Sequence, residues 1–328
     1  MSTRPVVYVT RRIPETGLAP VREACQVRLW EGELPPPKTV LLQEVADCDG
    51  LLCLLTDPID DEVMAAGPRL RVISQMAVGV DNIDLRAATV RGIPVGHTPG
   101  VLTEATADFT FALLMAAARR IPEGVDYVRA GKWRTWEPMG LLGVDVWGAT
   151  LGIVGMGRIG TAVARRAHGF AMHILYYDPT RRPELEAELG IEYAELDDLL
   201  ARSDFVSLHC PLTPETHHLI GEAALRRMKP TAILINAARG PVVDPAALVR
   251  ALSEGWIRAA ALDVTEPEPI PPDHPLLSLP NCIVLPHIAS ATVSTRERMA
   301  AMAAENLLAG LRGERLPYCA NPEVYARS

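Results

Sequence analysis

The chain has 328 residues, a net charge of −8 and 48% hydrophobic residues, which exclude a disordered chain and disfavour a nucleic-acid or membrane binder. The length predicts two domains. The six cysteines form no C-x-x-C pair, no signal peptide is evident, and no uncharged apolar run is long enough to span a membrane. We therefore expect a cytoplasmic protein without a metal site.

Short apolar segments alternate with helical patterns along the first hundred residues, which is typical of a parallel sheet covered by helices. The predicted strands are 6–10, 26–30, 50–55, 71–75 and 94–96, and the predicted helices are 39–46, 60–66 and 83–91. A long alanine-rich helix is then predicted at 103–120, with Thr103 as its N-cap.

A glycine-rich stretch at 131–148 separates this series from a second one. It holds three of the five tryptophans, Trp133, Trp136 and Trp147, so we expect a homodimer that uses this stretch. The later predicted elements are strands at 150–154, 173–177, 205–209, 231–236, 259–262 and 282–285 and a final helix at 295–312.

A dinucleotide-binding fingerprint, G-x-G-x-x-G, follows the strand at 150–154 directly. Gly155 would make the tight turn, Gly157 would let the backbone approach a pyrophosphate, and Gly160 would let helix and strand pack closely. The phosphates would then meet the positive end of the following helix.

Asp178 ends the next predicted strand, 18 residues after Gly160. A carboxylate at that distance is suited to the ribose 2′-hydroxyl and repels a 2′-phosphate, which favours NAD. Arg181 and Arg182 follow closely and could hold a phosphate, so NADP stays open as the alternative.

Several motifs together resemble the D-isomer-specific 2-hydroxyacid dehydrogenase family, and most closely its glyoxylate/hydroxypyruvate reductases. Besides the fingerprint, the motifs are 76–82, 101–108, 236–240, 262–269 and 286–290. The resemblance implies two α/β domains with the substrate in the cleft between them. Residues 1–101 and 290–328 would form a flavodoxin-like substrate domain, and residues 102–289 would form a doubly wound Rossmann domain inserted into it.

The resemblance also places the family's catalytic arginine, glutamate and histidine at Arg239, Glu268 and His287. A guanidinium binds the carboxylate of a 2-oxo acid with two parallel hydrogen bonds. An imidazolium gives a proton to the alkoxide that hydride transfer creates, and a carboxylate beside it orients the ring and favours its charged form. Without the motifs, Arg239 would be explained as a surface ion pair and Glu268 as a solvated acid.

Further contacts are implied by the same resemblance. Val78, Gly79 and Ser290 would contact the substrate, the first two through backbone N–H groups. The remaining cofactor contacts would be Thr106, Met156, Arg158, Ile159, Pro179, Thr180, Pro211, Thr216, Ala237, Ala238, Asp263 and Ala289. The other seven histidines are expected to be satisfied core or loop residues: His97, His168, His173, His209, His217, His218 and His274.

The predicted reaction is the reversible NAD(P)H-dependent reduction of glyoxylate or hydroxypyruvate to the 2-hydroxy acid. Some hydroxypyruvate-preferring relatives carry a tryptophan after Pro-Leu, whereas Pro138 is followed here by Met139, so the preferred acid stays open. The enzymatic alternatives are 3-phosphoglycerate and phosphite. From another class, a dinucleotide-sensing protein like the corepressors of this fold remains possible.

Overall fold

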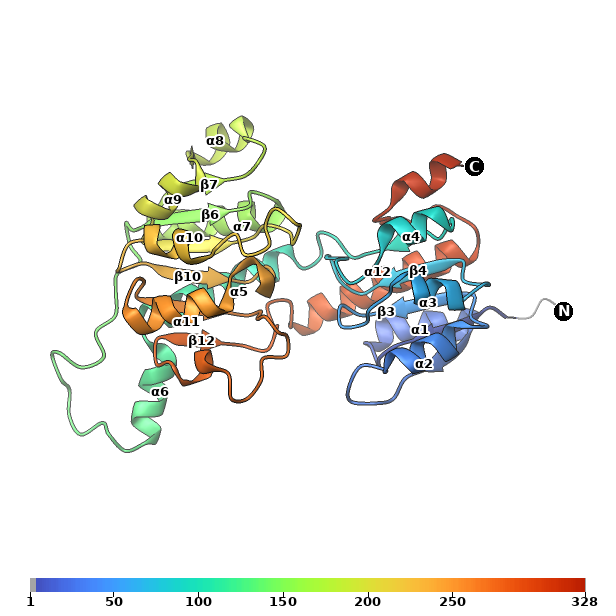
Figure 1. The fold of residues 1–328 in the computed structure, drawn as a ribbon, viewed down its shortest axis with the longest axis horizontal. Coiled ribbons are helices and arrows are strands. Elements are labelled where there is room, and N and C mark those ends of the chain that lie inside the picture. The colour runs from blue at the N-terminus through green and yellow to red at the C-terminus, as the bar shows by residue number, and fades with distance from the viewer. Residues whose placement is uncertain (1–3, 328) are drawn as a thin grey trace. The chain divides into compact units, whose positions relative to one another are not determined.

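The computed structural model describes residues 4–327, which form two compact units (Figure 1). One unit consists of residues 4–102 and 291–327, and the other consists of residues 103–290. Leu102 therefore lies in the first unit and Ser290 in the second, each one residue from the division expected from the sequence. Within residues 4–327, no helix combines the length and the hydropathy that crossing a membrane requires.

The first unit contains a five-stranded parallel sheet in the order β2-β1-β3-β4-β5. Its strands are β1 (Val6–Val9), β2 (Gln26–Leu29), β3 (Gly50–Cys53), β4 (Val72–Gln75) and β5 (Val95–Gly96). This is the flavodoxin-like order 2-1-3-4-5. All five strands were predicted from the sequence, with ends that differ by one or two residues.

Helices cover this sheet, and the last long helix of the chain returns to it. They are α1 (Glu15–Ala24), α2 (Lys38–Val45), α3 (Asp61–Ala66), α4 (Leu85–Val90) and α12 (Val293–Leu311), followed by the short η4 (Pro322–Arg327). α1 was not predicted, because it contains Gly17 and Pro20, which both disfavour a helix interior. Tertiary packing explains it: a Cβ on Gly17 would lie 2.4 Å from the carbonyl oxygen of Ala300, so α1 and α12 meet backbone to backbone.

The second unit contains a seven-stranded parallel sheet in the order β12-β11-β10-β9-β6-β7-β8. Its strands are β6 (Thr150–Val154), β7 (His173–Tyr177), β8 (Glu192–Tyr193), β9 (Phe205–Leu208), β10 (Ile233–Asn236), β11 (Ala259–Leu262) and β12 (Cys282–Val284). Numbered within the unit, the order is 3-2-1-4-5-6-7, the doubly wound Rossmann order with one added strand. The predicted fold class is therefore confirmed.

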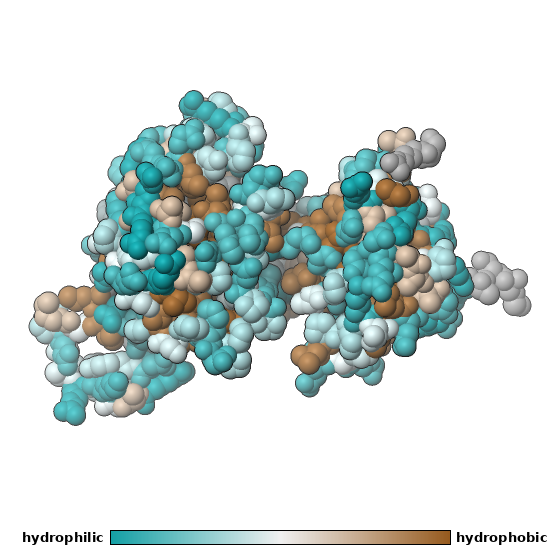
Figure 2. Space-filling view, in the orientation of Figure 1, coloured by the Kyte–Doolittle hydropathy of each residue, from teal (hydrophilic) through white to brown (hydrophobic). Residues whose placement is uncertain are grey.

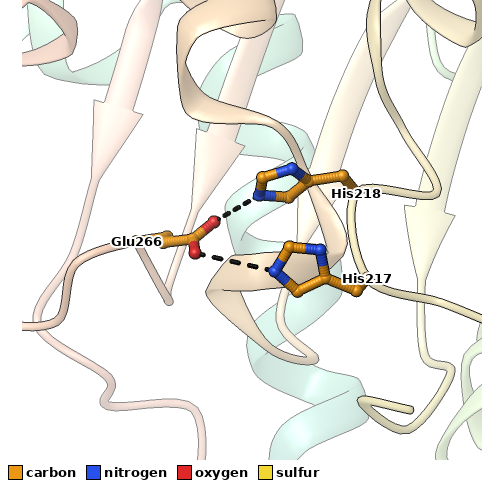
Figure 3. Close-up of side chains that lie close together, drawn as sticks. All are labelled: His217, His218 and Glu266. Carbon is orange, nitrogen blue, oxygen red and sulfur yellow. Dashed lines mark hydrogen bonds and ion pairs between the residues drawn. The ribbon is translucent and has the colours of Figure 1, made fainter. Parts of the chain in front are cut away.

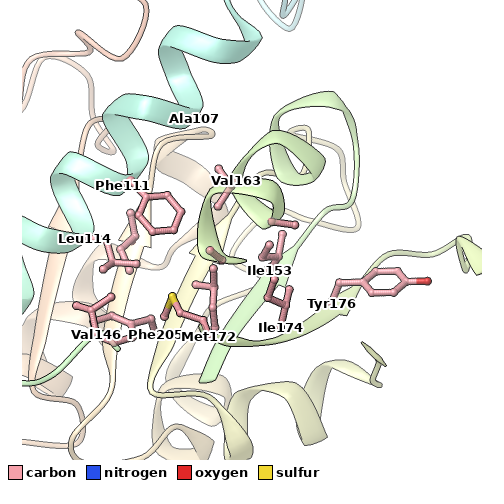
Figure 4. Packing of buried hydrophobic residues seen from close by; sticks show 14 of the residues in the cluster. Ala107, Phe111, Leu114, Val146, Ile153, Val163, Met172, Ile174, Tyr176 and Phe205 are labelled. Atoms are coloured by element: carbon pink, nitrogen blue, oxygen red, sulfur yellow. The ribbon is translucent and has the colours of Figure 1, made fainter. Parts of the chain in front are cut away.

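Two hydrophobic clusters cover the two faces of this sheet. Ile153 of β6 belongs to the cluster shown in Figure 4 with Phe111 and Val163, while its neighbour Val154 belongs to the opposite cluster with Leu208. Successive residues of a strand point to opposite faces, so β6 is apolar throughout because both of its faces are buried. The helices of the unit are α5 (Thr103–Ala118), α6 (Ile121–Arg129), α7 (Arg158–Ala167), α8 (Pro183–Leu189), α9 (Leu196–Arg202), α10 (Glu222–Arg227) and α11 (Pro245–Glu254).

Further details of the secondary-structure prediction are wrong. Thr103 is the first helical residue of α5 rather than its cap, and α5 ends at Ala118. The final helix begins two residues earlier than expected, because the Thr292 hydroxyl accepts the N–H of Thr295 and caps it there. β8 and the helices α6 and α8–α11 were missed; β8 has only two residues, too few to show a strand period.

Candidate active site

Polar or glycine residues follow the carboxyl ends of five neighbouring strands of the second sheet. Gly155 follows β6, His209 follows β9, Asp263 follows β11, and Arg239 and His287 come three residues after β10 and β12. Parallel strands place their carboxyl ends at one edge, which is where open α/β sheets bind ligands. The sheet thus brings most of the predicted site residues to a single edge.

The three glycines of the fingerprint are needed for different reasons. Gly155 has φ +97°, and a Cβ there would lie 2.5 Å from the Cys210 nitrogen, while a Cβ on Gly160 would lie 2.2 Å from the Gly155 oxygen. Gly157 caps α7, and a Cβ on it would meet nothing within 4 Å. The protein's own packing therefore requires Gly155 and Gly160, whereas the open space at Gly157, beside the start of α7, fits an approaching phosphate. Within the same loop, Met156 is buried, Ile159 is half-buried and Arg158 is exposed.

Asp178 lies directly after β7 and is tied to the glycine loop. Its Oδ2 accepts the N–H of Met156 at 2.9 Å, and its Oδ1 accepts the N–H of Thr180 at 3.0 Å. Pro179 and Thr180 are exposed.

The two arginines that left NADP open both have carboxylate partners. Arg181 pairs with Glu186 at 2.8 Å, and Arg182 pairs with Glu184. A bound phosphate would therefore have to compete with these acids.

His287 and Glu268 form the closest polar pair of the predicted catalytic residues. His287 Nδ1 lies 2.6 Å from Glu268 Oε1, and the two side chains are 25% and 35% exposed. Glu268 Oε2 also accepts a long hydrogen bond, 3.4 Å, from the N–H of Thr265. With Nδ1 engaged by the carboxylate, Nε2 is the ring nitrogen left to face a substrate.

Asp263 shapes the turn that carries His287. Its buried carboxylate accepts the N–H groups of Ile288 and Ala289, both at 2.8 Å, and its carbonyl accepts the N–H of His287 at 2.8 Å. Burial raises the pKa of Asp263, and the two N–H donors oppose that shift. His287 has φ +56°, in the left-handed region, so these bonds hold a backbone conformation that a non-glycine residue seldom adopts. Ala289 is buried and Ser290 is half-buried.

Arg239 is half-buried on a turn that the Asn236 side chain stabilises through two hydrogen bonds. The Asn236 side chain accepts the N–H of Ala238 at 3.0 Å and donates to the carbonyl of Arg239 at 2.9 Å. A Cβ on Gly240 would lie only 1.9 Å from the Thr265 oxygen, so this turn packs directly against the loop that leads to Glu268. Ala237 and Ala238 are half-buried in the same turn.

Sequence reasoning missed Asn236 and Thr265, which position their neighbours. The signal for Asn236 was its place as a polar residue at the end of an apolar strand. The signal for Thr265 was its hydroxyl group next to Glu266 in the sequence.

The other predicted residues fall into three groups. Thr106 is buried in α5, where its carbonyl accepts the hydroxyl of Thr110. The Thr216 hydroxyl donates to the carbonyl of Pro211 at 2.6 Å and closes the turn after β9. Val78 and Gly79 belong to the first unit, where their carbonyls accept hydrogen bonds from the side chains of His97 and Gln75.

His209 departs from the expected satisfied core histidine. Its Nε2 lies 2.8 Å from the Ser207 hydroxyl, but its Nδ1 is buried without a hydrogen-bond partner among the described residues. Burial lowers the pKa of His209 to about 4. The lowered pKa keeps the buried imidazole neutral. His209 also lies beside the glycine loop, because a Cβ on Gly155 would be 2.7 Å from the carbonyl carbon of His209.

Comparison with known proteins identifies relatives over almost the whole chain. A family model described as D-isomer specific 2-hydroxyacid dehydrogenase, NAD binding domain, matches residues 111–289. A glyoxylate reductase of Korarchaeum cryptofilum is 62% identical over 98% of this chain and 97% of its own. A glyoxylate reductase of Thermofilum pendens is 55% identical over 98% of this chain and 96% of its own.

Solved structures agree with this result. A crystal structure of a protein from Thermus thermophilus superposes with a TM-score of 0.91 at 52% identity, covering 96% of this chain and 99% of that one. An NADPH-dependent glyoxylate/hydroxypyruvate reductase from Sinorhizobium meliloti, in complex with NADP and malonate, gives a TM-score of 0.86 at 33% identity and covers 98% of both chains.

Proposed function

Because the chain belongs to the D-isomer-specific 2-hydroxyacid dehydrogenase family, we propose that it reduces glyoxylate or hydroxypyruvate to the 2-hydroxy acid, with NADH as the reductant. The relatives named glyoxylate reductase support this choice of substrate. The observation that carries the chemistry is the 2.6 Å pair of His287 and Glu268, with the loop of Glu268 packed against the Arg239 turn.

Each of the three side chains has a distinct task in this proposal. The Arg239 guanidinium binds the substrate carboxylate with two parallel hydrogen bonds, and the backbone N–H groups of Val78 and Gly79 are further donors to it. Protonated His287 gives the proton on Nε2 to the carbonyl oxygen as that oxygen becomes an alkoxide. Glu268 holds Nδ1, which sets the orientation of the ring.

Bound NADH supplies the hydride that the carbonyl carbon receives. The loop from Gly155 to Gly160 and the start of α7 would hold its pyrophosphate, and Asp178 would accept from the ribose 2′-hydroxyl. We favour NAD over NADP because Asp178 would repel a 2′-phosphate and because Arg181 and Arg182 already pair with carboxylates.

The proposal includes a homodimer formed through the stretch at 131–148. Trp133, Trp136 and Trp147 are 66%, 80% and 73% exposed, and hydrophobic residues gather where this stretch projects at the lower left of Figure 2. Large apolar side chains exposed together are typical of an interface. Light scattering at micromolar concentration should give twice the chain mass, and a monomer mass would contradict the dimer.

Steady-state assays in both directions test the substrate proposal. Glyoxylate and hydroxypyruvate should be reduced with NADH or NADPH faster than 3-phosphoglycerate or phosphite is oxidised with NAD⁺ or NADP⁺, and the absence of turnover with every acid would favour a dinucleotide sensor instead. His287→Ala should lower kcat by about 10²–10⁴-fold, the usual contribution of a general acid. NADH binding, followed by fluorescence, should stay unchanged in that variant, because His287 is assigned to the substrate and not to the nucleotide.

A further inference from the structure

Three side chains outside the proposed catalytic group converge on one point. His217 and His218 come from the segment that follows β9, and Glu266 comes from the loop that follows β11 (Figure 3). Glu266 Oε2 lies 2.7 Å from His218 Nε2, and Glu266 Oε1 lies 3.9 Å from His217 Nε2. Each carboxylate oxygen thus faces its own imidazole nitrogen. One possible ligand atom from each of the three residues lies within 4.8 Å of the other two.

The backbone around these side chains is held in place from both sides. The N–H of His218 donates to the carbonyl of Pro241 at 2.7 Å, and the N–H of Ile220 donates to that of Val242 at 3.0 Å. His218 has φ +52°, a left-handed conformation that persists because these bonds impose it. The two imidazole rings are also in contact, with centroids 4.0 Å apart and planes tilted by 31°.

We propose that His217, His218 and Glu266 bind a zinc-class transition-metal ion. Two imidazole nitrogens and one carboxylate oxygen are a donor set that Zn²⁺ accepts, whereas Ca²⁺ and Mg²⁺ prefer oxygen alone. Bonds of about 2.1 Å in tetrahedral geometry place ligand atoms about 3.4 Å apart. The distances of 2.7 and 3.9 Å lie on either side of that value, so small side-chain rotations suffice. The side chains of His217, His218 and Glu266 are 51%, 36% and 31% exposed, so an ion can reach them from solvent.

An ordinary ion pair accounts for less of this geometry. A single His218–Glu266 pair would explain one nitrogen and one oxygen, but His217 directs its Nε2 to the second oxygen of the same carboxylate. The turn with Gly240 and Pro241 lies between the two segments that carry the ligands. Gly240 packs against Thr265 and Glu266, and the Pro241 carbonyl accepts the N–H of His218. A bound ion would therefore link the two loops on either side of the Arg239 turn.

The test measures Zn²⁺ binding to the full-length chain without an affinity tag, by competition with a chromophoric chelator. The wild type should bind one ion per chain, and His217→Asn and Glu266→Gln should each weaken binding at least tenfold. His173→Asn is the matched control, because His173 is exposed and begins β7, at the edge of the sheet opposite the carboxyl ends of β9 and β11 that the cluster follows. Zn²⁺ should also raise the melting temperature of the wild type and of His173→Asn but not of Glu266→Gln, since a ligand stabilises only the fold that binds it.

A second measurement on the wild type does not depend on the folding of any variant. Co²⁺ at this site should give visible d–d absorption without a thiolate charge-transfer band, because no cysteine belongs to the cluster. A thiolate band, no saturable binding, or equal binding by wild type and the Glu266→Gln variant would overturn the proposal, since the ion would then be absent or bound elsewhere.

Discussion

His209 should make the second unit sensitive to mild acid. In the folded protein its pKa is about 4, lowered by burial, whereas an unfolded histidine has a pKa of about 6.5. Between these values the unfolded chain binds a proton that the folded chain excludes. Stability linked to His209 is therefore complete above about pH 6.5 and is lost as the pH falls toward 4.

The size of the effect follows from the two pKa values. At pH 5 an unfolded histidine is almost fully protonated, while His209 in the fold is protonated in about one molecule in ten. The free energy of unfolding should consequently fall by about 2 kcal/mol between pH 7 and pH 5, and the limit for the full shift is about 3 kcal/mol. The unpartnered Nδ1 means that no neighbouring acceptor compensates the added charge.

Urea unfolding of wild type and His209→Gln at both pH values measures this contribution. Four of the five tryptophans lie in the unit that holds His209, so fluorescence follows that unit. The variant should lose about 2 kcal/mol less than the wild type on acidification, because the carboxylates titrate alike in both proteins. His173→Gln, which removes an exposed histidine, should behave as the wild type does. Equal acid losses in wild type and His209→Gln would refute the reasoning.

Four further substitutions test the proposed site. Glu268→Gln replaces the carboxylate that holds His287 Nδ1 at 2.6 Å by a neutral amide, so kcat for glyoxylate reduction should fall while NADH binding stays unchanged; an unchanged kcat would remove Glu268 from the mechanism. Asp178→Ser should raise the Kd for NADH and lower that for NADPH in fluorescence titrations, and equal use of both by the wild type would contradict the NAD assignment. Gly155→Ala should destabilise the protein by about 1–3 kcal/mol in urea, because of its φ of +97° and the 2.5 Å approach to backbone, whereas Gly157→Ala should leave stability intact and weaken NADH binding.

Local patterns in the sequence are sufficient for most of the strands and for the fingerprint. A strand buried on both faces is a short apolar run, and β6, β7 and β11 begin and end where those runs do. The spacing of Gly155, Gly157 and Gly160 is a near-neighbour property, because one turn and the start of one helix use all three. Both are therefore visible without knowledge of which segments lie beside each other.

Contacts between distant segments are different, since they depend on the order of the strands in the sheet. Glu266 meets His218 across 48 residues only because the segments after β9 and β11 both reach the turn that follows β10. α1 forms despite Gly17 and Pro20 because α12, near the other end of the chain, packs against it. In the same way, the packing around His209 buries its Nδ1 and leaves it without a hydrogen-bond partner among the described residues. Burial and hydrogen-bond satisfaction are properties of assembled surroundings, and no window of sequence contains them.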